Sequence, residues 1–363
     1  MKVLFISDTG SICPIAARLA RTVGVQVYIH NPDYAKTYDG MIPKVSLKEL
    51  RAATQLSDTI IIDADRKNSG SQHDAVLLKM FALPAELTYV FGSVGKVLSR
   101  DHYVIGAATF LGDPDPPNTS DPEGRAVQLW LADGEIKHCF SMVECRHWLS
   151  GSLGPTAESQ SISLWKAEVP DGIDSLVNCL NRHKYTGPCK IRLDKDGKPT
   201  ERLVHFTFDD TFATLALLKT SLADFLIGGF EGKFKDDYAA CERITIQPYP
   251  YVNVELKKAF AEGVAVDEDS DDFWAQDVCQ QDGKIICAGQ DGLVGTLTMV
   301  ERTLPHVWGR LYHRAKHLRI GADLQYRIDG FKVASKICGA EKWATSSATC
   351  SAAGEAKLVT SRR

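Results

Sequence analysis

Three residues near the middle of the chain, His205, Asp209 and Asp210, have side chains that bind metal ions or move protons. They lie where the β-forming run RLVHFTF meets the helix-forming run TFATLALL, so the pattern predicts a strand that leads into a helix. The strand presents metal ligands to a nucleotide, or it is a scaffold strand without that role. Imidazole suits transition metals better than Mg²⁺, and the two aspartates are also typical caps of a following helix.

A second candidate for chemistry is the run FGSVGKVLSR, where Ser93, Gly95 and Lys96 resemble a small phosphate clamp. The run is shorter than a P-loop, and no Ser or Thr follows the lysine. A plain turn between two strands is the favoured alternative, because short glycine motifs are weak signals.

Two further groups of ligand-type residues have simpler interpretations. The run HCFSMVECRH holds His138, Cys139, Cys145 and His147, but their spacing matches no common zinc site, so a buried strand pair is favoured. The acidic run DEDSDD at residues 267–272 lacks the glycine and the final Glu of an EF-hand loop. We therefore expect a solvated acidic loop there.

The composition is that of a soluble globular protein, with 44% hydrophobic and 24% charged residues in a chain of 363. A formal net charge of −4 gives no bulk attraction to nucleic acid or to an anionic membrane, although a local basic groove is compatible with it. The sequence shows no membrane span and no secretory signal, so a cytoplasmic location is expected. Ten scattered cysteines without a CxxC pair are expected to be reduced and buried.

Strands and helices alternate over residues 1–66. The runs KVLFIS, VQVYIH and DTIIIDA predict strands, and the segments between them predict helices. This alternation predicts a small parallel α/β unit.

The remaining pattern is mixed. Residues 126–148 predict strands, and CKIRLDKDGKPTERLVHFTF predicts a hairpin that turns at Asp196–Gly197. We expect one helix from Ala213 that is broken at Gly228–Gly229, and then a new unit of strands and a helix from about Arg243. The basic residues of that last helix are expected to form a solvated face: Arg310, Arg314, Lys316 and Arg319.

The order of several motifs resembles glycinamide ribonucleotide synthetase (phosphoribosylamine–glycine ligase), a family of the ATP-grasp superfamily. MKVLFISDTGSICPIAARLA resembles the opening strand, glycine loop and helix of that family, and SLGPTAESQSISL resembles its substrate loop. The hairpin, metal-ligand strand and helix of the family correspond to residues 185–234, and its closing strand–helix–strand to GLVGTLTMVERTLPHVWGRLYHRAKHL and YRIDGF. We expect Tyr326, Arg327 and Asp329 of the last motif to be structural.

The resemblance implies a mixed α/β fold of ATP-grasp type. The expected domains are an N-terminal α/β domain at 1–66, a reduced ATP-lid or linker region at 67–135 and an ATP-grasp-like core at 136–235. A β-rich C-terminal domain at 240–335 and a flexible tail at 336–363 complete the chain.

The resemblance also implies site residues, several of which depart from the family pattern. The Glu, Asn and Arg of the family's metal-ligand strand fall on His205, Thr207 and Asp209, and few of its substrate-loop glycines are kept. On this basis the candidate sites are the following. The candidate catalytic residues are Asp209, Asp210 and Arg146, and the candidate metal ligands are His205 and Asp209. The candidate substrate-binding residues are Gly10, Ser11, Gly154, Pro155 and Thr156. The residues expected to bind the phosphates of the cofactor are Ser93, Gly95 and Lys96.

Three functions follow as hypotheses. The first is a diverged ligase that joins an amino acid to an amine with ATP and Mg²⁺, as in purine biosynthesis. The second is a ligase-derived protein that no longer uses ATP and Mg²⁺ and that binds a nucleotide-like ligand or a partner, or carries out other chemistry. The third is an interaction protein. The expected partner is a small molecule, with neither a membrane nor nucleic acid indicated.

Overall fold

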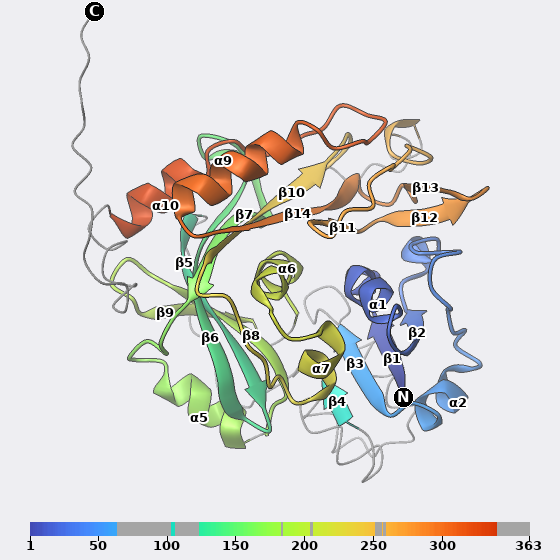
Figure 1. Ribbon diagram of the computed structural model, residues 1–363, viewed down its shortest axis with the longest axis horizontal. Coiled ribbons are helices and arrows are strands. Elements are labelled where there is room, and N and C mark those ends of the chain that lie inside the picture. The colour runs from blue at the N-terminus through green and yellow to red at the C-terminus, as the bar shows by residue number, and fades with distance from the viewer. Residues whose placement is uncertain are drawn as a thin grey trace, which may run out of the picture.

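The computed structural model describes residues 1–63, 103–105, 123–182, 184–203, 206–250, 256 and 259–339. The candidates Ser93, Gly95, Lys96 and His205 lie outside these residues, as do most of the expected lid region and the tail beyond residue 339. Figure 1 shows a small parallel sheet at the N-terminus beside a much larger antiparallel sheet.

The N-terminal unit is the predicted parallel α/β unit. Its sheet has the order β2-β1-β3-β4, formed by β1 (Lys2–Ser7), β2 (Gly24–Ile29), β3 (Thr59–Asp63) and β4 (Tyr103–Ile105). Helices α1 (Cys13–Leu19) and α2 (Leu50–Gln55) and the short 3-10 helix η1 (Pro32–Tyr34) lie in the connections. The strands β1 and β3 are apolar and buried along almost their whole length, as expected for a parallel sheet that is covered on both faces.

The large sheet has eight antiparallel strands in the order β11-β14-β10-β7-β6-β5-β8-β9. The strands are β5 (Glu123–Ala132), β6 (Glu135–Leu149), β7 (Leu153–Lys166), β8 (Gly187–Leu193), β9 (Pro199–Leu203), β10 (Tyr238–Thr245), β11 (Phe273–Ala275) and β14 (Leu293–Glu301). A separate hairpin joins β12 (Val278–Gln281) and β13 (Lys284–Cys287). Strands from both sides of residue 240 share this sheet, so the expected domain boundary there does not interrupt it.

Helices cover both faces of the large sheet. On one face α6 (Phe208–Leu217) contacts β7, β10 and β14, and α7 (Leu222–Ile227) lies between that face and the N-terminal unit (Figure 1). On the other face α9 (Leu304–Ala315) and α10 (Gly330–Cys338) cover β5, β6, β7, β10 and β14, and α5 (Asp174–Arg182) packs on β5, β6 and β8. None of the helices in the described part of the chain combines the length and apolar composition that a membrane-spanning helix needs.

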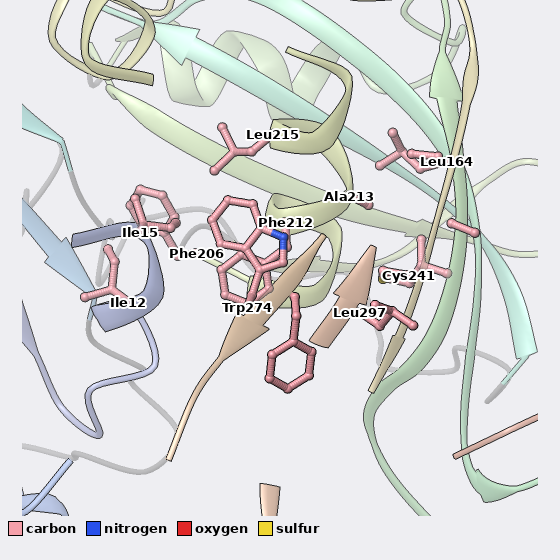
Figure 2. Close-up of a cluster of buried hydrophobic side chains, with 14 of the residues drawn as sticks. Ile12, Ile15, Leu164, Phe206, Phe212, Ala213, Leu215, Cys241, Trp274 and Leu297 are labelled. Carbon is pink, nitrogen blue, oxygen red and sulfur yellow. The ribbon is translucent and has the colours of Figure 1, made fainter. Parts of the chain in front are cut away.

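The main core joins α6 to both the large sheet and the N-terminal unit. Figure 2 shows Phe212 of α6 stacked on Trp274 of β11, with ring centroids 4.6 Å apart, and Ile12 and Ile15 beside them. Trp130 of β5 contacts three phenylalanine rings edge-on in the same cluster. This packing fixes α6 as the central helix of the molecule.

Several local expectations are corrected. The predicted single helix is two helices, and the break lies at residues 218–221, whereas Gly228 is the residue at which α7 ends. The expected substrate loop, residues 152–164, forms most of the 14-residue strand β7. The YRIDGF motif forms no strand, and its last two residues begin α10. The predicted hairpin turn at Asp196–Gly197 is confirmed, because Asp194 N donates to Lys198 O (2.8 Å) and Gly197 has φ +85°.

Candidate functional site

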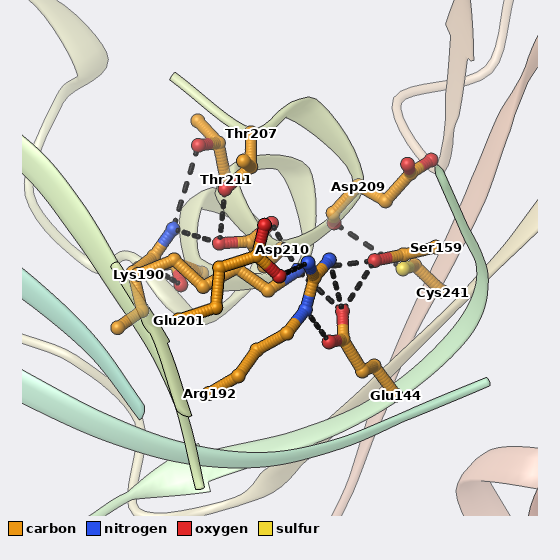
Figure 3. Close-up of polar contacts among 12 residues, drawn as sticks. Glu144, Ser159, Lys190, Arg192, Glu201, Thr207, Asp209, Asp210, Thr211 and Cys241 are labelled. Carbon is orange, nitrogen blue, oxygen red and sulfur yellow. Dashed lines mark hydrogen bonds and ion pairs between the residues drawn. The ribbon is translucent and has the colours of Figure 1, made fainter. Parts of the chain in front are cut away.

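A network of buried charges lies between the large sheet and the first turn of α6. Lys190 and Arg192 of β8 and Glu144 of β6 point toward Asp210 of α6 (Figure 3). Lys190 and Arg192 are two residues apart, so they share one face of their strand, while Cys189 and Ile191 face the α5 side. The sheet therefore carries a polar interior on the α6 side.

Lys190 is the centre of this network, and its side chain is only 1% exposed. Its Nζ lies 2.6 Å from Glu144 Oε2 and 3.5 Å from Asp210 Oδ1, and it donates to Ser159 Oγ at 3.0 Å. Burial by itself would lower the pKa of Lys190, but the carboxylates of Asp210 and Glu144 raise it above its ordinary value. Lys190 is therefore a permanent buried cation and not a proton donor at neutral pH.

The partner carboxylates are held by several donors each. Burial opposes the ionisation of Glu144, but Lys190 and Arg192 keep its pKa well below the usual range. Arg192 also pairs with Glu201 of β9. Asp210 Oδ2 accepts hydrogen bonds from Gln128 Nε2 and Thr207 Oγ1, both at 2.7 Å, and burial raises its pKa.

A second buried ion pair holds the neighbouring aspartate. Arg243 of β10 pairs with Asp209 Oδ2, and Thr296 Oγ1 of β14 donates to Asp209 Oδ1 at 3.0 Å. Arg243 Nη1 also donates to the hydroxyl of Tyr249 at 3.0 Å. Adjacent residues of one helix turn are thus tied to strands on opposite sides of β7.

The alternative prediction, that Asp209 and Asp210 cap the following helix, is wrong because neither is the N-cap residue of α6. Thr207 is the N-cap residue of α6 and makes no side-chain cap bond, whereas the two aspartates lie inside the first turn and are 3% and 0% exposed. Their charges face internal cations, with the positive end of the helix dipole as a further favourable term. Their predicted catalytic roles stay predictions.

The two aspartates do not fit the Mg²⁺ role that the resemblance implies. Every carboxylate oxygen of Asp209 and Asp210 has a cation or a donor within 3.5 Å. Within the described ranges, no group of three His, Cys, Asp or Glu side chains gathers into a possible metal site. That statement includes the HCFSMVECRH run on β6, whose His138 and His147 contact the carbonyls of Phe230 and Gly154.

The predicted substrate residues occupy two different sheets. Gly10 and Ser11 follow β1, where Gly10 N donates to Ser7 Oγ at 2.8 Å and Ser7 Oγ donates to Asp63 Oδ2 at 2.8 Å. By contrast, Gly154, Pro155 and Thr156 are exposed at the start of β7. Arg146 is partly buried where the register of β6 and β7 shifts between Cys145 and His147.

Most of the charged network was not predicted from the sequence. One signal was present: charged residues at alternate positions inside apolar strands, as in CKIRL, indicate a strand face that is buried but polar. A contact between the acidic loop at residues 267–272 and α9 was also not predicted. Arg314 pairs with Glu268 at 2.5 Å and with Asp272 at 3.0 Å, so Arg314 is not part of a solvated face.

Comparison with known proteins gives a likeness of fold. No family model and no curated protein matches the sequence. Solved structures that resemble it include the phosphoribosylamine–glycine ligase of Thermotoga maritima, with 14% identity and a TM-score of 0.55 over 91% of this chain and 100% of that chain. The pyruvate carboxylase of Rhizobium etli gives 12% identity and 0.52, over 95% of this chain and 38% of that one.

A third similar structure is the biotin carboxylase domain of a thermophilic 2-oxoglutarate carboxylase, with 10% identity and a TM-score of 0.51 over 94% of this chain and 95% of that one. The chain therefore has the mixed α/β fold of these enzymes, and the ATP-grasp-like fold predicted from the sequence is confirmed. At these identities the likeness concerns fold and leaves function to the residues of this chain.

Proposed function

We propose that this protein is a nucleotide-binding protein built on an ATP-grasp ligase scaffold, and that it does not couple ATP to ligation. One observation carries the proposal: Asp209 and Asp210, at the strand–helix junction that resembles the metal site, are each neutralised by a buried internal cation. A carboxylate that already pairs with Arg243 or Lys190 would have to lose that pair before it gained a metal ion.

The carboxyl ends of β1 and β3 are the proposed ligand edge. In parallel sheets, ligands bind outside the carboxyl ends of the strands. Here Thr9 and Ser11 are half-buried, with their hydroxyls 2.7 Å apart. Gly10 has φ +80°, and a Cβ there would meet Ile29 and Thr37 at 3.1 Å, so the turn that holds these hydroxyls requires glycine.

The test is calorimetry of ATP binding with Mg²⁺ and, separately, with EDTA. We expect the same dissociation constant in both conditions, within about twofold, because the buried aspartates are not available to the metal. Ser11→Ala should weaken binding about fivefold, the effect of one hydrogen bond, whereas Ser152→Ala, in the turn between β6 and β7, should not. Failure to bind any nucleotide, or a loss of binding in EDTA of tenfold or more, would contradict the proposal.

ATP-dependent carboxylate–amine ligation is the second candidate. It is favoured by the likeness to phosphoribosylamine–glycine ligase over the whole length of that chain. Its test is the release of ADP from Mg-ATP in the presence of amino acids and amines. ADP release that is abolished by Asp209→Asn, in a variant that still folds, would replace the first proposal with this one.

A further inference from the structure

The segment that holds α9 and α10 carries a concentration of positive charge. Residues 302–338 contain eight Lys and Arg but only two Asp and Glu. The whole chain carries −4 and this segment +6, which leaves −10 on all other residues. The charge of the molecule is therefore strongly segregated, although its sum is close to neutral.

Most of these cations face away from the sheet. α9 and α10 cover the same face of the large sheet and lie at the outer edge of the molecule in Figure 1. Two of the eight cations, Arg314 and Arg327, are used internally, and Arg310 pairs with Glu301. The exposed side chains form what we call the basic face: Arg302, His306, Arg310, His313, Lys316, His317, Arg319, Lys332 and Lys336.

Five members of the basic face, Arg302, Lys316, Arg319, Lys332 and Lys336, form no ion pair with the part of the chain that the structure describes. Such charges keep their full attraction for an external anion. The 12-residue helix α9 is about 18 Å long. That length spans about ten phosphate charges of a duplex, so the spacing suits an extended polyanion better than a single small anion.

We propose that the basic face binds the phosphate backbone of duplex nucleic acid. The aromatic side chains of α9 are not available for stacking on single-stranded bases, since Trp308 is buried with its Nε1 bonded to Ser163 Oγ (2.9 Å) and Tyr312 is half-buried. The charge of the rest of the molecule repels a polyanion, so this is the face that approaches it. Backbone contacts of this kind carry affinity without sequence specificity.

The experiment measures fluorescence anisotropy of a labelled duplex DNA of about 20 base pairs over a range of salt concentrations. The variant Arg302→Gln/Lys316→Gln/Arg319→Gln removes three exposed cations. We expect the slope of log K, where K is the association constant, against log salt concentration to be shallower by about 2 to 3 for this variant. Its affinity at about 50 mM salt should fall at least tenfold. A second variant, Lys332→Gln/Lys336→Gln, should reduce the slope by about 2.

The matched control is Lys195→Gln/Lys198→Gln/Lys233→Gln, which changes the net charge as much as the triple variant does, at exposed lysines that are not part of α9, α10 or the segment between them. It should bind the duplex like the unmodified protein, and thermal unfolding should show that all three variants fold. Equal loss in control and test variants, or no duplex binding at low salt, would overturn the proposal. Binding to anionic vesicles is measured separately, because the apolar side chains of Ile328 and Phe331 are exposed near the start of α10 and could contact a membrane surface. Binding to vesicles without binding to the duplex would also overturn the proposal.

Discussion

Lys190 has no access to water, so its effect on stability depends on the carboxylates around it. Lys190→Met leaves Glu144 and Asp210 buried beside each other without their shared cation. We expect the free energy of unfolding to fall by about 3–5 kcal/mol, the usual cost of removing one partner from a buried ion pair. Urea unfolding measures the change.

The control for this prediction is the exposed Lys195→Met, which should stay within about 0.5 kcal/mol of the unmodified protein. The double variant Lys190→Met/Asp210→Asn should lose less than the sum of its two single variants, because the second substitution removes the uncompensated charge. Strict additivity would show that Lys190 and Asp210 do not act as a pair.

Asp277 provides a prediction on pH. It follows β11, its Oδ1 accepts from Thr37 Oγ1 at 3.1 Å, and its Oδ2 accepts from Gln290 N. Burial, followed by the charge of Asp291, raises the pKa of Asp277 to about 7. In the unfolded chain the pKa is about 3.9, so between these values the folded state keeps a proton that the unfolded state loses.

Stability must therefore fall as pH rises from about 4 to about 7, by up to about 1.4 kcal/mol per pH unit, and level off above that window. Asp277→Asn cannot titrate and should flatten the profile, whereas Asp282→Asn, at an exposed turn, should leave it unchanged. Melting temperatures measured between pH 4 and pH 8 give the comparison. Parallel profiles for Asp277→Asn and the unmodified protein would refute the assignment.

At the scale of elements, the contact between α9 and α10 depends on one glycine. A Cβ at Gly330 would lie 2.4 Å from Cη2 of Trp308, and that ring is fixed by its bond to Ser163. Gly330→Ala should therefore push α10 away from α9 and cost about 1–3 kcal/mol. Gly309→Ala on α9 is the matched control: nothing lies within 4 Å of its Cβ position, and it should be neutral or stabilising by up to about 1 kcal/mol. Thermal unfolding that ranks the two variants equally would contradict this account.

Most elements could be predicted because their signals are local. The alternation of β8 and β9 and the Asp-Gly turn between them lie within 17 residues, and the apolar runs of β1 and β3 are continuous. The break between α6 and α7 was misplaced for a physical reason. Glycine marked a plausible stop, but Ser221 begins a new helix with its own cap, since its Oγ accepts from Asp224 N at 3.1 Å.

The partners of the site could not be predicted because they are distant in sequence. Asp209 and Asp210 were recognised as important, but Arg243 and Glu144 lie 34 and 48 residues from their partners Asp209 and Arg192. Only the pairing order of the strands brings these groups to one helix turn. From residue types alone, such aspartates are interpreted as metal ligands or helix caps. The cation that neutralises each of them can be identified only when the strand order of the sheet is known.

At the scale of the whole molecule, the N-terminal unit is joined to the large sheet by the shared apolar core and by polar contacts around β11. Tyr38 OH donates to Ala275 O at 2.5 Å, and Thr37 contacts Asp277. Arg18 of α1 makes the most extensive contact, with its guanidinium 3.1 Å from the ring centroid of Trp274 and with hydrogen bonds to the carbonyls of Asp271 and Phe273 at 2.9 and 3.0 Å. The proposed ligand edge belongs to this unit, so its position relative to the sheet depends on Arg18.

Arg18→Ala should therefore loosen the N-terminal unit while the large sheet stays intact. We expect faster hydrogen exchange in β1 and β3, corresponding to a loss of about 1–3 kcal/mol, because a desolvated cation–π contact and two hydrogen bonds disappear together. Exchange in β5 and β6 should not change, since neither strand contacts Arg18. Arg21→Ala, just after the end of α1, is the matched control: its ion pair with Asp271 is exposed, 61% and 85% for the two side chains, and is worth little. Equal protection of β1 in the Arg18 and Arg21 variants would show that the apolar cluster of Phe212, Trp274 and Ile15, and not Arg18, holds the unit in place.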